Sequence, residues 1–189
     1  MGSVSKFYLT TIFLLFFISC SSNKKTKNSI LLEKKDTIHN EYSDCTFDQQ
    51  NQTEDFIKKI KELKNYSWNS KNKTATIKIT SDETLKIHRG GCNHFLLSAE
   101  FILPKNFTLK KDKKYIFSKL IWVSKLIYNK HDYKIIKESI ENNRITLDSP
   151  NKKKGHVNFL NKEIYNNYTI FYDEEQLNKN VFSIEYYIN

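Results

Sequence analysis

The side chains best suited to chemistry in this 189-residue chain are gathered in residues 85–95. This segment contains His88, Arg89, Cys92 and His94, together with a pair of adjacent glycines. Imidazole and thiolate groups bind zinc, and they also act as bases and nucleophiles in hydrolases. On an uninterrupted strand, the even spacing of the two histidines and the cysteine would place all three on one face. The segment is therefore the first candidate for a functional site.

The first twenty residues resemble the signal of bacterial lipoproteins. Lys6 precedes an apolar segment over residues 8–18, which is shorter than the about 20 residues of a membrane span. Residues 17–20, Phe-Ile-Ser-Cys, then resemble the lipobox, with Phe17 where that family usually has leucine. The resemblance implies that Cys20 carries lipid, including palmitate, and anchors the protein in the envelope of a Gram-negative bacterium. The absence of aspartate directly after Cys20 favours the outer membrane.

The resemblance also divides the chain and fixes its redox environment. Residues 1–19 are expected to be a signal peptide, 20–44 a lipidated flexible tether, and 45–189 a single globular domain. Once Cys20 is lipidated, Cys45 and Cys92 are the remaining thiols. In an oxidising compartment we expect them to form a disulfide, which would stabilise the fold by roughly 4 kcal/mol.

The glycine pair weakens the case for metal binding or catalysis. Gly90 and Gly91 favour a bulge or a positive φ, and a bulge breaks the alternation that would align the candidate ligands. The spacing matches no common zinc motif, and Cys92 cannot attack a substrate while it is in a disulfide. We therefore predict no catalytic residue, metal or cofactor. The turn is either a structural feature with His88 and His94 in polar surroundings, or a recognition loop.

Periodicity indicates the elements that position this turn. Alternating residues predict strands over 73–80 and 84–89, joined as a hairpin, and an apolar run predicts a third strand over 95–103. The glycine pair lies between the second and third strands. Before them, Thr53 as N-cap and an apolar stripe predict a helix over 54–65.

The second half of the chain predicts helices followed by strands. Residues 113–128 are apolar on most of the helix circumference, which predicts a helix buried between layers. Asp132 is expected to cap a second helix that runs to about Asn142. Further strands are predicted over 145–147, 157–160, 168–172 and 181–188. The fold class is therefore α+β, with an antiparallel sheet built as a meander of strands, two central helices, C-terminal strands and one N-terminal helix.

The formal charge of +10 raises the question of an anionic partner. Apart from Arg89 and Arg144, every basic residue is lysine, in a chain also rich in Asn, Ile and Tyr. A/T-rich codons produce this composition without selection for a charged face. We do not expect nucleic acid as a partner, whereas an anionic polymer of the envelope is still a possible partner.

These inferences favour a lipid-anchored, non-catalytic binding module for a protein or an envelope polymer, for example an inhibitor or immunity-type lipoprotein. The candidate recognition patch is His88, Arg89, Asn93 and His94, because a disulfide would pre-organise their loop. One alternative is an envelope hydrolase or metal-dependent enzyme that uses His88 and His94. Another is a structural accessory subunit of an envelope complex. The sequence contains no Walker, G-x-S-x-G, H-E-x-x-H or Rossmann motif.

Overall fold

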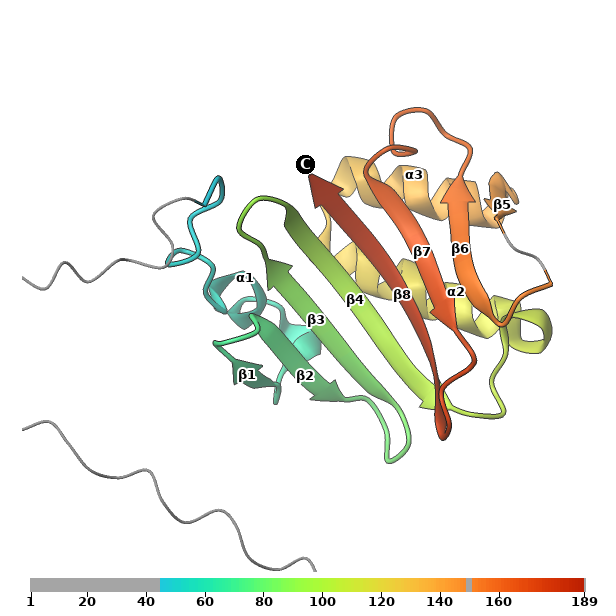
Figure 1. Ribbon diagram of the computed structural model, residues 1–189, viewed down its shortest axis with the longest axis horizontal. Helices are drawn as coiled ribbons and strands as arrows, with labels where there is room; N and C mark the ends of the chain where they lie inside the picture. The colour runs from blue at the N-terminus through green and yellow to red at the C-terminus, as the bar shows by residue number, and fades with distance from the viewer. Residues whose placement is uncertain (1–44, 149–150, 189) are drawn as a thin grey trace, which may run out of the picture. The chain divides into compact units, whose positions relative to one another are not determined.

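The computed structural model describes residues 45–148 and 151–188, and one antiparallel sheet of eight strands forms its centre. The strand order is β1-β2-β3-β4-β8-β7-β6-β5, as Figure 1 shows. The strands are β1 Ser67–Asn69, β2 Thr74–Lys78, β3 Thr84–Gly90, β4 Phe95–Pro104, β5 Ile145–Leu147, β6 Lys154–Phe159, β7 Tyr168–Asp173 and β8 Lys179–Ile188. The helices are α1 Asp55–Lys58, the short 3₁₀ helix η1 Lys61–Leu63, α2 Leu109–Ile127 and α3 Lys130–Glu141. The predicted α+β class with an antiparallel sheet is confirmed.

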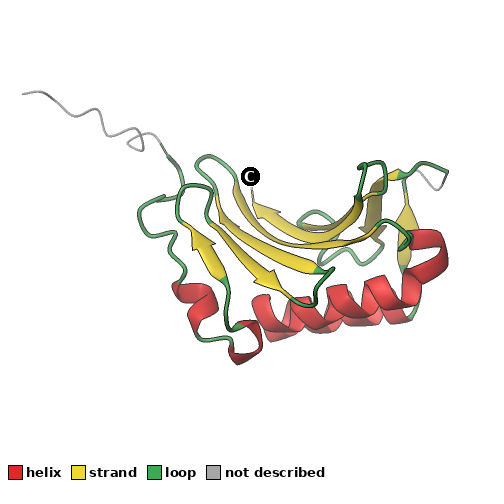
Figure 2. Ribbon diagram, turned by 90° about the horizontal axis from the view of Figure 1, so that it is seen from below, coloured by secondary structure: helices red, strands yellow, loops and turns green. Residues whose placement is uncertain are grey.

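The two faces of the sheet have different surroundings. Figure 2 shows the helices on the convex side and a concave side that they leave free, which we call the open face. Most side chains on the helix side are apolar and buried, as alternation along each strand requires. They include Leu85, Ile87, Ala99, Phe101, Leu103, Val157, Phe159, Ile170, Phe182 and Ile184. Each large side chain of this kind contributes about 1.5–3 kcal/mol when it leaves water, so this layer is the main source of stability.

Polar caps define where the two long helices begin. The hydroxyl of Thr108 accepts a hydrogen bond from the backbone N–H of Lys111 at the start of α2. At the start of α3, the side chain of Asn129 accepts from the backbone N–H of Asp132. Between the helices, the hydroxyl of Tyr128 lies 3.2 Å from two carbonyl oxygens in β4 and β8. This contact fixes the α2–α3 junction to the centre of the sheet.

Several predicted boundaries were wrong, each for a local reason. The predicted helix over 54–65 is two short pieces, α1 and η1, because Ile60 is extended between them. This break allows both Ile57 and Leu63 to be fully buried, so packing outweighs helical periodicity. The N-cap of α1 is Glu54, not Thr53, and the N-cap of α3 is Asn129, not Asp132.

The environment of α2 also differs from the prediction. The helix begins at Leu109, four residues earlier than predicted, and it covers one side of the sheet instead of lying between two layers. Its outward side carries the exposed residues Lys114, Ser118 and Lys125. The short edge strand β1 was not predicted. The predicted signal peptide, Cys20 and the tether over 20–44 lie outside the described residues.

Candidate functional site

The glycine pair forms a tight turn between β3 and β4. Gly91 has a φ of +147°, which confirms the predicted positive φ. A Cβ atom at Gly91 would lie 1.7 Å from the carbonyl oxygen of His94, and one at Gly90 would lie 2.8 Å from Oε1 of Gln52. Gly91 therefore requires glycine, because a larger residue would clash with backbone, whereas a side chain at Gly90 would have to displace the Gln52 amide.

The segment before α1 fastens this turn. Cys45 and Cys92 form the predicted disulfide, with 47 residues of sequence separation. Next to it, the backbone N–H of Phe47 donates to the carbonyl of Cys92 at 2.9 Å, and the ring of Phe47 packs on Phe95. The disulfide joins the start of the domain to the β3–β4 turn, so the turn has a clear structural role.

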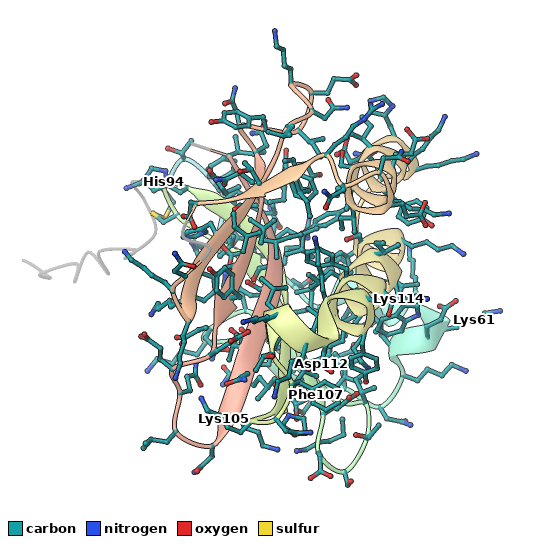
Figure 3. All side chains as sticks on the ribbon, turned by 90° about the vertical axis from the view of Figure 1, so that its right-hand side faces the viewer. Lys61, His94, Lys105, Phe107, Asp112 and Lys114 are labelled. Carbon is teal, nitrogen blue, oxygen red and sulfur yellow. A yellow bond between two sulfur atoms is a disulfide. The ribbon has the colours of Figure 1, made fainter. Side chains whose placement is uncertain are left out.

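The four residues of the predicted recognition patch lie in different places. His88 is on the open face, whereas the Arg89 guanidinium is on the helix side, 5.3 Å from the centre of the Phe56 ring. Asn93 and His94 are exposed in the turn itself. Figure 3 shows His94 near the disulfide, on the sheet side of the molecule. The structure therefore does not bring these four side chains together on one surface.

The same geometry bears on the enzyme alternative. His88 and His94 do not share a pocket, because only His88 lines the hollow described below. Within residues 45–148 and 151–188, no group of three or more His, Cys, Asp or Glu side chains could hold a metal ion.

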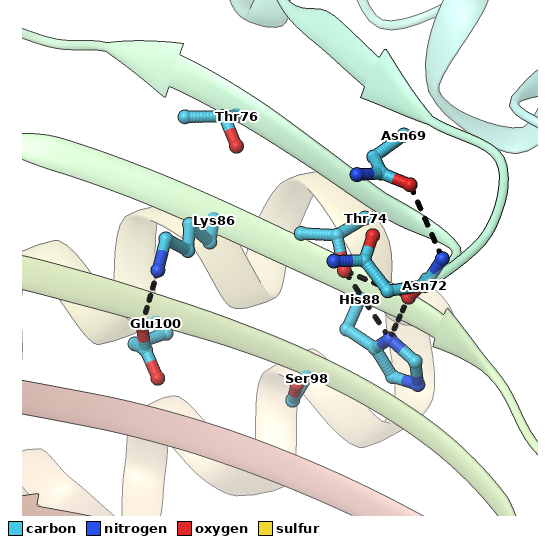
Figure 4. Close-up of a pocket in the computed structure, with 8 residues that line it drawn as sticks. All are labelled: Asn69, Asn72, Thr74, Thr76, Lys86, His88, Ser98 and Glu100. Atoms are coloured by element: carbon cyan, nitrogen blue, oxygen red, sulfur yellow. Dashed lines mark hydrogen bonds and ion pairs between the residues drawn. The ribbon is translucent and has the colours of Figure 1, made fainter.

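The hollow on the open face is the best candidate site. It has a volume of about 260 Å³, and its lining is polar throughout. The side chains come from β1, the β1–β2 turn, β2, β3 and β4, and Figure 4 shows them around the depression. They are Asn69, Asn72, Thr74, Thr76, Lys86, His88, Ser98 and Glu100.

The β1–β2 turn sets the orientation of His88. Nδ1 of His88 lies 2.9 Å from the carbonyl oxygen of Asn72, and the hydroxyl of Thr74 donates to the same oxygen at 2.9 Å. A backbone carbonyl can only accept, so Nδ1 carries a proton and donates to it. The β1–β2 turn therefore holds the His88 ring in a fixed orientation.

The rest of the lining offers both donors and acceptors. Nζ of Lys86 and Oε1 of Glu100 lie 3.7 Å apart, and both side chains are partly exposed. In Figure 4 the hydroxyls of Thr76 and Ser98 make no contact with the other side chains drawn. Hydroxyl, amide and paired charged groups together fit a polar ligand with both kinds of hydrogen-bonding group.

Most of this site was missed by the sequence analysis, which singled out only His88 among its residues. A signal was present, because Thr74 and Thr76 alternate with buried residues, as do Lys86 and His88 in the next strand. Polar alternation on adjacent hairpin strands predicts a polar sheet face. It does not predict that the face curves, which is what forms a hollow.

A second polar cluster lies on the helix side and has a structural role. Glu83, in the β2–β3 turn, accepts hydrogen bonds from Tyr115 and from Lys119, the latter at 2.7 Å. Burial raises the pKa of the Glu83 carboxyl, but these two hydrogen bonds outweigh it and hold the pKa below its usual value. Beside it is a shallow, largely apolar depression of about 320 Å³ lined by Ile79 and Trp122, among others. The cluster ties the β2–β3 hairpin to α2.

Comparison with known proteins found no matching family, no matching curated protein and no matching solved structure. No helix in the described part of the chain is long and apolar enough to cross a membrane.

Proposed function

We propose that this protein is a non-catalytic binding module, anchored by lipid on Cys20 in the envelope of a Gram-negative bacterium, and that its partner binds the open face of the sheet. One observation carries the proposal: the open face is concave and holds a hollow whose whole lining is polar, while the opposite face is used for the core. Concave sites with converging polar groups are the usual places where ligands bind.

The contacts of His88 support binding over catalysis. A catalytic histidine needs a nucleophile or a substrate proton on one ring nitrogen and an orienting group on the other. Here Nδ1 contacts the neutral carbonyl of Asn72, which holds the ring but does not stabilise an imidazolium as a carboxylate would. An imidazole held in this way serves recognition, because its orientation is fixed before a ligand binds.

The lipid anchor would keep this domain close to envelope polymers and envelope proteins. The tether over 20–44 would separate the folded domain from the membrane surface, which leaves the open face accessible. The partner is then a polymer or protein of the envelope.

Photo-crosslinking in cells tests which face binds. A photoreactive amino acid at Thr76, in the hollow, is expected to give a covalent adduct on illumination. The matched control places the same residue at Glu138, which is exposed on α3 on the opposite side of the sheet. Adducts from Glu138 with none from Thr76 would overturn the proposal.

A further inference from the structure

The polar surface of the hollow continues across the rest of the sheet, as the pairing of residues between strands shows. Asn69 in β1 pairs with Thr74 in β2, which pairs with His88 in β3, which pairs with Ser98 in β4. All four side chains line the hollow on the open face. They form the first half of a row that runs perpendicular to the strands.

The row continues through the other four strands without an apolar residue. Ser98 pairs with Glu185 in β8, and Glu185 pairs with Thr169 in β7. Thr169 pairs with Asn158 in β6, which pairs with Thr146 in β5. Paired residues of antiparallel strands share a face, so all eight side chains belong to the open face. Adjacent strands lie about 4.8 Å apart, so this row across the eight-stranded sheet is roughly 34 Å long.

A second row runs beside the first. In each strand it lies two residues away from the first row, toward higher numbers in one strand and lower numbers in the next. It includes Thr76, Lys86, Glu100 and Ser183, all of them polar. It then reaches Phe171, whose ring packs against His156 at a centroid distance of 5.3 Å. We call the two rows together the polar track.

One residue in the track has an unmet hydrogen-bonding requirement. Thr169 is nine-tenths buried, and its hydroxyl has no hydrogen-bond partner among the described residues. Its register partner Glu185 accepts from Ser183 at 2.7 Å. A buried hydroxyl without a partner destabilises the fold unless another polar group reaches it.

The charge of the track decides between classes of polymer. The chain as a whole has a formal charge of +10, but the permanent charges of the two rows are one lysine, Lys86, and two glutamates, Glu100 and Glu185. Lys86 is paired with Glu100, so the track has no excess of positive charge. The track itself therefore offers a polyanion such as nucleic acid no row of unpaired cations to match its phosphates.

We propose that the polar track binds a linear, uncharged glycan that lies across the strands; this deepens the proposed function and rests on it. Sugar hydroxyls both donate and accept, which matches a surface of amide, hydroxyl and carboxylate groups. Phe171, which contacts His156 and has Nζ of Lys154 5.6 Å from its ring centre, supplies the aromatic part of the track, and an extended hexasaccharide has a length comparable with the track. A peptide fits less well, because extended peptides pair with sheet edges, and here the edge strands β1 and β5 are three residues each.

Calorimetry on the full-length chain in detergent tests the proposal with four linear probes: cellohexaose, chitohexaose, maltohexaose and laminarihexaose, each beside its disaccharide. At least one hexasaccharide is expected to bind about tenfold or more tighter than its disaccharide, because only the longer chain spans both halves of the track. Asn158→Ala, in the half of the track outside the hollow, is expected to weaken that hexasaccharide about three- to tenfold. The same variant should leave the disaccharide unchanged. Lys134→Ala, on the exposed side of α3, is the control and should change neither.

Three results would overturn the inference. Equal affinity for hexasaccharide and disaccharide, with loss of both in His88→Ala only, would limit binding to the hollow. If a polyuronic acid bound tightly, and Asn158→Ala weakened that binding, the ligand would be charged. If none of the four hexasaccharides bound, a glycan ligand would be ruled out. The proposed function would still stand if the photoreactive residue at Thr76 gave an adduct with a protein.

Discussion

The side-chain amide of Gln52 pairs with the peptide of Gly91 as a neighbouring strand would. Nε2 of Gln52 donates to the carbonyl oxygen of Gly91 at 2.8 Å, and the N–H of Gly91 donates to Oε1 of Gln52 at 2.9 Å. Gln52 is buried, and the residues between it and the disulfide are held over the turn. The turn that first suggested chemistry is therefore fixed by one amide and one disulfide.

Replacing this amide should loosen the turn without changing the core. We expect Gln52→Ala to lower the free energy of unfolding by about 2 kcal/mol, because it removes two hydrogen bonds from a partly buried peptide. Chemical denaturation measures the change. The exposed neighbour Gln50→Ala is the control and should change stability by less than about 0.5 kcal/mol. Equal stability of both variants would mean that Gln52 does not hold the turn.

The disulfide should contribute more than the amide. Cys45→Ser and Cys92→Ser are each expected to lower the melting temperature by several degrees, since the disulfide restricts the unfolded chain by roughly 4 kcal/mol on the chain-entropy estimate. The double variant should resemble either single variant. Mass spectrometry before and after reduction should show a gain of two hydrogen atoms. Unchanged melting in all three variants would remove the disulfide from the account of stability.

The Glu83 cluster predicts a pH-dependent stability. At neutral pH, Glu83→Gln should be less stable than the wild type by about 2 kcal/mol, because the partly buried Lys119 ammonium loses its paired negative charge and Tyr115 loses a charged acceptor. The fold lowers the Glu83 pKa, so the contribution is complete above the pKa of an unfolded glutamate, about 4.3. It is lost as the pH falls through the lower pKa of the folded state.

Thermal denaturation of both proteins between neutral and acidic pH tests this. The two melting curves should converge at the acidic end. Glu138→Gln is the control, because Glu138 is exposed and its ion pair with Lys134 is 3.9 Å long. A constant difference between wild type and Glu83→Gln at all pH values would contradict the assigned role.

The proposed anchor predicts a covalent lipid. Cells that produce the protein in the presence of an alkyne analogue of palmitate should yield a labelled chain, and Cys20→Ser should abolish the label. Cys45→Ser keeps Cys20 and is the matched control. A label that persists in Cys20→Ser would place the lipid elsewhere or remove the anchor from the proposal.

The strands were predicted well because the chain alternates clearly. The hairpin of β2 and β3 follows from the alternation in residues 74–90, and the disulfide was predicted from the two thiols that would remain if Cys20 were lipidated in an oxidising space. The hairpin needs only local contacts, and two cysteines allow only one pairing although they are 47 residues apart. The predicted extent of the N-terminal helix, 54–65, was wrong because Ile57 and Leu63 are both buried in the core, which a local pattern does not reveal.

The candidate site was largely hidden from the sequence. The sequence analysis selected His88, Arg89, Asn93 and His94 because they stand in a segment rich in rare residue types. Strand alternation places His88 and Arg89 on opposite faces of the sheet, and the other two lie in the turn. The polar track consists instead of common residues such as Thr146 that are up to about a hundred positions apart. Only the register of all eight strands aligns them.

The most direct test of the open face as the binding surface is hydroxyl-radical footprinting in intact cells, compared with the purified full-length chain. His88, His156 and Phe171 report on the open face, and Tyr115, exposed on α2, reports on the helix side. The account predicts lower oxidation of the first three residues in cells, with Tyr115 unchanged. Protection of Tyr115 with no change at His88 and Phe171 would contradict it, because the partner would then cover the helices and leave the open face free.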